Sequence, residues 1–156
     1  MEKEFLKTIQ ECQKIISKVC QLYRDTKQDQ EDLFQEIVYQ LWKSYPGFRS
    51  ESKISSWIYR IAINTAIVIY RKPGLKIKYY DEIPQHFHPS FEKEKSDNEE
   101  KLFNALRKLS DVEKAIVSLY LDDYSYREIA EITGISENNV GVRLNRIKNK
   151  LKQLIK

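Results

Sequence analysis

The segment that follows Ser136 carries amide and basic side chains at the spacing of one helical face. At about 100° per residue, this face collects Asn139, Arg143, Arg146 and Lys150. A separate apolar stripe contains Val140, Leu144, Ile147, Leu151 and Leu154. Asparagine pairs with adenine, arginine pairs with guanine, and arginine or lysine neutralises phosphate groups. The segment therefore predicts a helix that reads the DNA major groove with its apolar stripe turned inward.

The residues immediately before this helix predict the framework of a helix-turn-helix. Ala130 is small enough for two helices to cross closely, Gly134 permits the positive φ of a tight turn, and Val140 packs the second helix on the first. The alternative is a solvated surface helix with basic residues near its carboxyl end. That alternative explains the charges but leaves the alanine, glycine and valine spacing unexplained.

A second cationic face is predicted in the N-terminal half. Arg60, Asn64, Ile67 and Arg71 follow a helical spacing, and Lys53 projects to the same side. Residues 53–72 include no acid. One basic face in each half suits contact with DNA at two separate places, although a solvated face neutralised by another helix fits this second pattern equally well.

Three helices are expected before residue 72. The first covers about residues 4–24, and the second follows Asp29 as its N-cap and ends at Pro46-Gly47. The second has an unusually wide apolar face, which indicates contact on two sides. The third covers about residues 54–71. Its expected buried residues are Ile54, Trp57, Ile58, Ile61, Ala62, Thr65 and Ile69. For Trp57, packing in the core is favoured over stacking on a base.

Four helix starts are expected in the C-terminal half. The Ser-x-x-Glu pattern of a capping box occurs as Ser96 with Glu99, Ser110 with Glu113 and Ser125 with Glu128. A fourth helix begins after Ser136. No strand pair with a hairpin turn is visible, so the predicted class is all-α.

Composition and length fit two small soluble domains. Of the 156 residues, 41% are hydrophobic and 32% charged, and the net charge of +4 is too small to identify a nucleic-acid ligand by itself. Pro73, Pro84 and Pro89 mark a linker over 73–97. No apolar run suits a membrane span and the first residues lack a secretory pattern, so a cytoplasmic location without membrane insertion is expected.

No metal, cofactor or disulfide is expected. Cys12 and Cys20 would lie about 12 Å apart on one helix, which is too far for a disulfide, and both suit an apolar core. His86 and His88 have no further ligand at metal-binding spacing and are expected in a loop.

Two stretches of the chain resemble the bacterial sigma factors. Residues 31–37, followed by Trp42, Phe48 and residues 57–64, resemble sigma region 2. Residues 109–151 resemble region 4. With only a short linker between them, the arrangement is similar to the extracytoplasmic-function (ECF) group. The resemblance implies an all-α fold of two small helical domains joined by a flexible linker: a region 2 three-helix bundle over 1–72 and a region 4 four-helix helix-turn-helix domain over 98–156.

The same resemblance implies specific roles. By this resemblance, the helix that carries Asp32, Gln35 and Glu36 would dock on the clamp helices of RNA polymerase. The minus 10 element would be recognised and opened by the 48–53 loop and by Lys53, Arg60, Asn64 and Arg71. The minus 35 element would be read by Asn138, Asn139, Arg143, Arg146 and Lys150, while the helix after Ser110 faces the polymerase flap. Core RNA polymerase, promoter DNA and an anti-sigma factor are the implied partners, and the implied activity is promoter recognition rather than catalysis.

Two other functions compete with this interpretation. A free-standing helix-turn-helix regulator would use the same C-terminal half, but no dimer seam matching two half-sites is visible. A helical nuclease could hold a metal through Glu31, Asp32 and Glu36, although no histidine, phosphate loop or nucleophile accompanies them.

Overall fold

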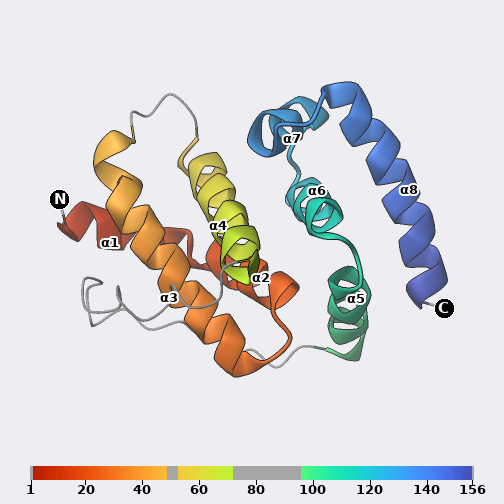
Figure 1. The fold of residues 1–156 in the computed structure, drawn as a ribbon, viewed down its shortest axis with the longest axis horizontal. Coiled ribbons are helices and arrows are strands. Elements are labelled where there is room, and N and C mark those ends of the chain that lie inside the picture. The colour runs from red at the N-terminus through yellow and green to blue at the C-terminus, as the bar shows by residue number, and fades with distance from the viewer. Residues whose placement is uncertain (1, 49–52, 72–95, 156) are drawn as a thin grey trace. The chain divides into compact units, whose positions relative to one another are not determined.

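The computed structural model describes residues 2–48, 53–71 and 96–155, in which the regular elements are helices and no strand occurs (Figure 1). The chain divides into two compact units, Met1–Glu92 and Lys93–Lys156. The predicted all-α fold of two small helical domains is confirmed. Most of the predicted linker, including His86 and His88, lies outside the described residues, so its bounds remain a prediction. Among the described helices, none has the length and apolar character needed to cross a bilayer.

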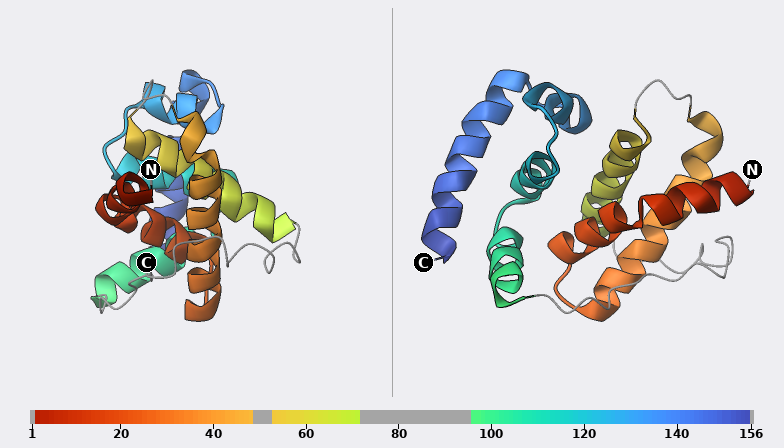
Figure 2. Two further views of the ribbon diagram at one scale, coloured as in Figure 1. Left: turned by 90° about the vertical axis from the view of Figure 1, so that its left-hand side faces the viewer. Right: turned by 180° about the vertical axis from the view of Figure 1, so that it is seen from behind.

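The first unit is built on three mutually packed helices: α2 (Gln13–Tyr23), α3 (Lys27–Ser44) and α4 (Ile54–Arg71). A further helix, α1 (Glu2–Glu11), contacts α2 and leads directly into it (Figure 2). Side chains from all of these helices form the core. The largest fully buried ones are Phe5, Ile9, Ile16, Leu22, Phe34, Ile37, Leu41, Ile58 and Tyr59. Burial of this shared apolar surface is what holds the unit together.

The predicted single helix over 4–24 is wrong, because the helix is interrupted at Cys12, where φ is −107° and ψ is 14°. The Thr8 hydroxyl donates to the Glu4 carbonyl at 2.9 Å, a back-bond of the kind that bends helices. On the α1 side of the interruption, Phe5 packs edge-to-face on Trp42 at 4.9 Å and on Tyr45 at 5.3 Å. Long-range aromatic packing thus accompanies the departure from one straight helix.

Helix α3 begins earlier than predicted. Thr26 is its N-cap and accepts a hydrogen bond from the Asp29 backbone N–H at 3.1 Å, so the expectation that Asp29 is the cap is wrong. Asp29 lies instead in the first turn, where a negative charge favours the helix dipole. As predicted, α3 ends at the proline and glycine, which here form the short 3₁₀ helix η1 (Tyr45–Gly47).

The predicted bounds of α4 are confirmed, but its buried face is turned slightly from the predicted one. Ile58, Ala62 and Thr65 are buried as expected, whereas Ile54, Trp57 and Ile61 are only half-buried. The side chain of Ile69 lies outside the described part. The interior also receives Tyr59, Ile63 and Ala66. Contact with both α2 and α3 therefore decides which side of α4 is buried.

The second unit contains α5 (Asp97–Arg107), α6 (Asp111–Leu121), α7 (Tyr126–Thr133) and α8 (Glu137–Ile155). All four predicted starts are confirmed: the hydroxyls of Ser96, Ser110, Ser125 and Ser136 accept backbone N–H groups of the following turn. The boxes of α6 and α7 are complete, with Glu113 and Glu128 each accepting from the cap residue's N–H at 3.0 Å. Helices α5, α6 and α7 all contact α8.

Gly134 ends α7 in the left-handed conformation, with φ 79° and ψ 10°, as the turn required. Its N–H donates to the Ala130 carbonyl at 2.9 Å. We expect Gly134→Ala to lower the free energy of unfolding of this unit by about 1 kcal/mol, because a Cβ is strained at this φ. Urea unfolding followed by circular dichroism measures the loss. Gly134→Asn, which tolerates this conformation better, should lose less, and an equal loss for both would contradict the explanation.

Candidate nucleic-acid interface

Helices α7 and α8 form the predicted helix-turn-helix around Gly134. Val140, Leu144 and Ile147 of α8 are buried, as is Ile129 of α7. The predicted inward stripe weakens farther along, since Leu151 is half-buried and Leu154 is 37% exposed. The core therefore fixes the first three turns of α8 and leaves the opposite surface of those turns available to a ligand.

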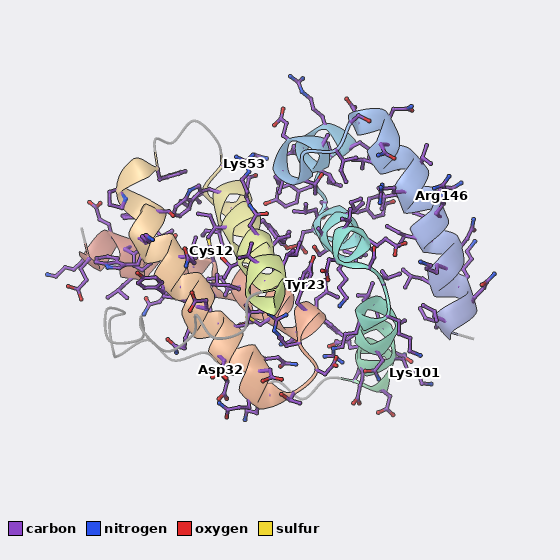
Figure 3. All side chains as sticks on the ribbon, in the orientation of Figure 1. Cys12, Tyr23, Asp32, Lys53, Lys101 and Arg146 are labelled. Carbon is purple, nitrogen blue, oxygen red and sulfur yellow. The ribbon has the colours of Figure 1, made fainter. Side chains whose placement is uncertain are left out.

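The predicted DNA-reading residues of α8 are exposed, with one exception. Asn138, Asn139, Arg146 and Lys150 are exposed, and Arg143 is half-buried (Figure 3 labels Arg146). At about 100° per residue, Arg143 and Lys150 lie toward the edge of the exposed face. The direction opposite the buried residues is instead occupied by Val142, with Asn145 beside it, and both are exposed. Sequence reasoning missed these two because it followed the basic stripe rather than the face opposite the core.

Lys150 makes a long-range ion pair. Its ammonium lies 3.1 Å from Glu113 Oε1 and 3.2 Å from Oε2, which joins α8 to α6. Partial burial by itself raises the pKa of the Glu113 carboxyl, but hydrogen bonds from the Ser110 N–H and Lys150 outweigh it and hold the pKa below its ordinary value. One carboxylate thus caps α6 and also holds α8. Lys150 therefore helps to hold α8 against α6.

The lowered pKa of Glu113 predicts a loss of stability in acid. A carboxyl with a lower pKa in the folded state stabilises the fold above the unfolded pKa of about 4.3, and this contribution is lost as the pH falls through the folded value. Glu113→Gln keeps the capping geometry but should flatten this part of the pH profile of unfolding. Because Lys150 is 53% exposed, we expect a coupling of only about 0.5 kcal/mol in a double-mutant cycle with Lys150→Met. Zero coupling at neutral pH would contradict the ion pair's role.

The second predicted basic face is present on α4. Lys53, Arg60 and Asn64 are exposed, while the side chain of Arg71 and residues 49–52 lie outside the described part. Tyr59, Ala62 and Ala66, on the other side of α4, are fully buried. The core thus presents one polar and cationic surface of α4 to the solvent.

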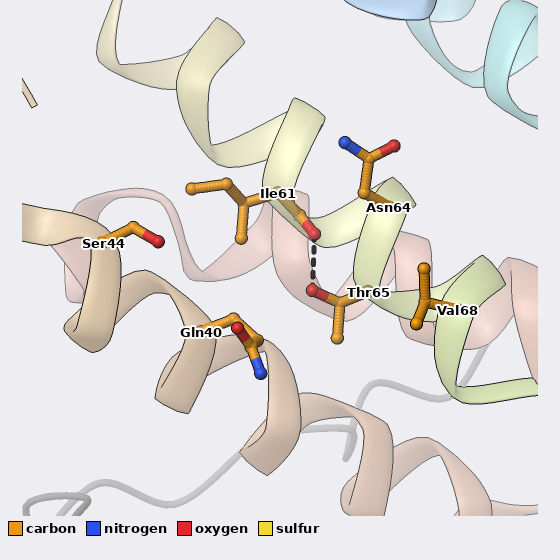
Figure 4. A pocket seen from close by; sticks show the side chains of 6 residues that line it. All are labelled: Gln40, Ser44, Ile61, Asn64, Thr65 and Val68. Atoms are coloured by element: carbon orange, nitrogen blue, oxygen red, sulfur yellow. Dashed lines mark hydrogen bonds between the residues drawn. The ribbon is translucent and has the colours of Figure 1, made fainter. Parts of the chain in front are cut away.

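A groove of about 280 Å³ lies between α3 and α4 next to this surface (Figure 4). Gln40 and Ser44 line it from α3 and Ile61, Asn64, Thr65 and Val68 from α4. The Thr65 hydroxyl donates to the Ile61 carbonyl at 2.6 Å, so it is committed to the helix backbone. The amides of Gln40 and Asn64 and the apolar side chains of Ile61 and Val68 combine polar edges with apolar walls. Such a lining suits a flat, hydrogen-bonding ring such as a nucleobase.

Two sets of contacts hold α4 in place. The Arg24 guanidinium donates to the Ala66 carbonyl at 3.1 Å, and the buried Gln30 amide donates to the Arg24 carbonyl at 3.1 Å. At the other end of α4, Trp57 packs on Phe48 at 4.9 Å and on Tyr45 at 6.2 Å. Trp57 is half-buried, so it packs against other rings at the edge of the core rather than deep inside it.

The acids of α3 are less accessible than predicted. Asp32 and Gln35 are half-buried, and the Asp32 carboxylate accepts from the Gln28 amide at 3.2 Å. Glu36 is only 3% exposed and accepts from the Gln40 amide at 3.2 Å, which corrects its expected surface position. Its carboxylate orients a residue of the groove instead.

Among the described residues, no group of three or more histidine, cysteine or acidic side chains could hold a metal ion. This applies also to the set of Glu31, Asp32 and Glu36. Cys12 and Cys20 are both free thiols, and burial raises the pKa of Cys20 well above its ordinary value. Cys20 lies in the core as predicted, whereas Cys12 is half-buried.

Comparisons with known proteins match both units to one protein family. The family model for Sigma-70 region 2 matches residues 8–74, and that for Sigma-70 region 4 matches residues 99–151. RNA polymerase sigma factor SigV of Bacillus subtilis is 35% identical, with 80% of this chain and 74% of SigV covered. SigZ of the same organism is 34% identical, with 80% of this chain and 72% of SigZ covered. In fold, the chain is similar to the sigma factor RpoE from Bartonella quintana, solved with the anti-sigma factor NepR, at a TM-score of 0.75 and 22% identity over 98% and 97% of the two chains.

Proposed function

The chain belongs to the sigma-70 family of RNA polymerase sigma factors, in its ECF group, and we propose that its two units bind a promoter at two separate elements. As a sigma factor it directs sequence-specific promoter recognition and transcription initiation. Residues 98–156 are the proposed minus 35 domain and residues 1–72 the proposed minus 10 domain, joined by residues 73–97.

The minus 35 element is assigned to α8. Asn138, Asn139 and Arg146 are exposed on its first three turns, where a recognition helix meets base edges, and Arg143 borders them. Asparagine and arginine can form the bidentate pairs that distinguish adenine and guanine in the major groove. Lys150 is assigned mainly to the alignment of α8, through Glu113.

The minus 10 element is assigned to α4 and the groove beside it. Lys53, Arg60 and Arg71 would neutralise phosphates, and Asn64 would contact an unstacked base of the non-template strand that enters the groove. Binding the exposed strand offsets the unpairing cost of a few kcal/mol, so opening requires no hydrolysis and no catalytic residue.

Core RNA polymerase is the first protein partner. Asp32 and Gln35 remain partly exposed on α3 and are the proposed docking residues, with α6 toward the polymerase flap. The related RpoE was solved in complex with an anti-sigma factor, as was CnrH with a domain of CnrY, and we extend such a partner to this chain. The proposed place of action is the cytoplasm, with the polymerase.

The observation that supports the function best is the joining of a helix-turn-helix unit to an α4 unit with its own basic face in one chain. Run-off transcription with core polymerase and a promoter library tests it. We expect sequence-selective initiation only when the chain and the core enzyme are both present. Tight duplex binding by the chain alone, with no effect on polymerase, would instead favour a free-standing regulator.

A further inference from the structure

One apolar side chain lies at the centre of the exposed face of α8. Val142 is 44% exposed, and at about 100° per residue it points about 160° away from the buried Val140 and Leu144. It belongs to the second turn of the helix, which is the part of a recognition helix that enters the major groove.

The surroundings of Val142 are polar and suited to DNA. Asn138, Asn139, Asn145 and Arg146 are exposed and, by helical geometry, lie within about 60° of it on the two sides. Before the last turn of α8, Val142 is the one exposed large hydrophobic residue of this helix. A β-branched residue is disfavoured in a helix, and here little burial compensates for it. A valine at this place therefore suits contact with a ligand better than it suits stability of the free helix.

The residue before Val142 is a glycine that a ring of α7 covers. A Cβ on Gly141 would lie 3.4 Å from the Tyr126 ring of α7, so the ring packs closely over this glycine. Helix α7 thus borders α8 next to Val142, and no side chain at position 141 competes with the valine for a base.

We infer that Val142 is a specificity-determining residue that contacts the C5-methyl group of a thymine in the element read by α8. This inference rests on the proposed function of α8. Thymine is the one DNA base with a methyl group in the major groove, and apolar side chains recognise it by contact. The adjacent asparagines and Arg146 can bind the polar edges of neighbouring bases, which aligns the valine with the methyl group.

Uracil substitution tests the inference, because it removes the methyl group and retains the pairing. The minus 35 elements preferred by the full chain with core polymerase are first selected from a library. Each thymine is then replaced singly by uracil, and initiation is measured by run-off transcription. At one thymine we expect about a fourfold loss, which corresponds to one methyl group removed from an apolar contact.

The variants give the decisive comparison. Val142→Ala should initiate equally from thymine and uracil at that position, whereas Val142→Thr retains a γ-methyl group and should retain part of the discrimination. Ile155→Ala is the matched control, since Ile155 is also β-branched and is 47% exposed in the last turn of α8, and it should discriminate as the wild type does. Indifference of the wild type to uracil, or full discrimination by Val142→Ala, would overturn the inference. Failure of the proposed function would give a different result. In that case, scrambling the whole minus 35 element would leave initiation unchanged.

Discussion

Replacing both Arg143 and Arg146 with alanine should reduce initiation by about 100-fold from a promoter with the preferred minus 35 element. A bidentate pair between arginine and a base is worth about 1–3 kcal/mol, and about 1.4 kcal/mol corresponds to a factor of ten. Arg146 is exposed and Arg143 is half-buried, so the larger part of the loss should come from Arg146. Run-off transcription with core polymerase and each single variant measures the two shares.

The matched control removes two positive charges at another place in the same unit. Lys101 and Lys108 are exposed residues at α5 and its carboxyl end, and Figure 3 labels the first of them. Their double alanine variant should initiate within about twofold of the wild type, because distant charges are screened by salt. On a promoter with a scrambled minus 35 element, wild type and arginine variant should become equal. A loss that persists there would assign the arginines to general stability or to polymerase binding.

Phe5→Ala should lower the free energy of unfolding of the first unit by about 3–5 kcal/mol. Phe5 is fully buried, and its ring contacts those of Trp42 and Tyr45. Removing it leaves a cavity and ends both edge-to-face contacts. Because domains are typically stable by only about 5–15 kcal/mol, this change could unfold much of the unit at moderate temperature.

Tryptophan fluorescence reports this unit selectively, because the two tryptophans of the chain, Trp42 and Trp57, both lie in it. The urea midpoint of the fluorescence change should fall strongly for Phe5→Ala. Phe5→Leu retains most of the apolar volume and should lose clearly less. If the alanine variant unfolded at the wild-type midpoint, α1 would be a dispensable addition to the bundle.

Local chemistry explains which parts of the fold were predictable. The serine caps of α5 to α8 and the left-handed glycine after α7 depend on residues within one turn, so short sequence patterns located them correctly. The bounds of α4 were equally accessible, because its apolar periodicity is strong. The start of α3 was misplaced because Thr26 and Asp29 are both acceptable caps, and only the observed hydrogen bond distinguishes them.

The sequence by itself determined the all-α class, the helix-turn-helix and the existence of two basic faces, because backbone capping and side-chain periodicity are short-range properties. Only the tertiary structure decided which side chains of those faces are presented to a ligand. The Lys150 ion pair with Glu113 and the burial of Glu36 both depend on partners or neighbours far along the chain. Such contacts arise when helices pack around a shared core, and no pattern within one helix specifies them.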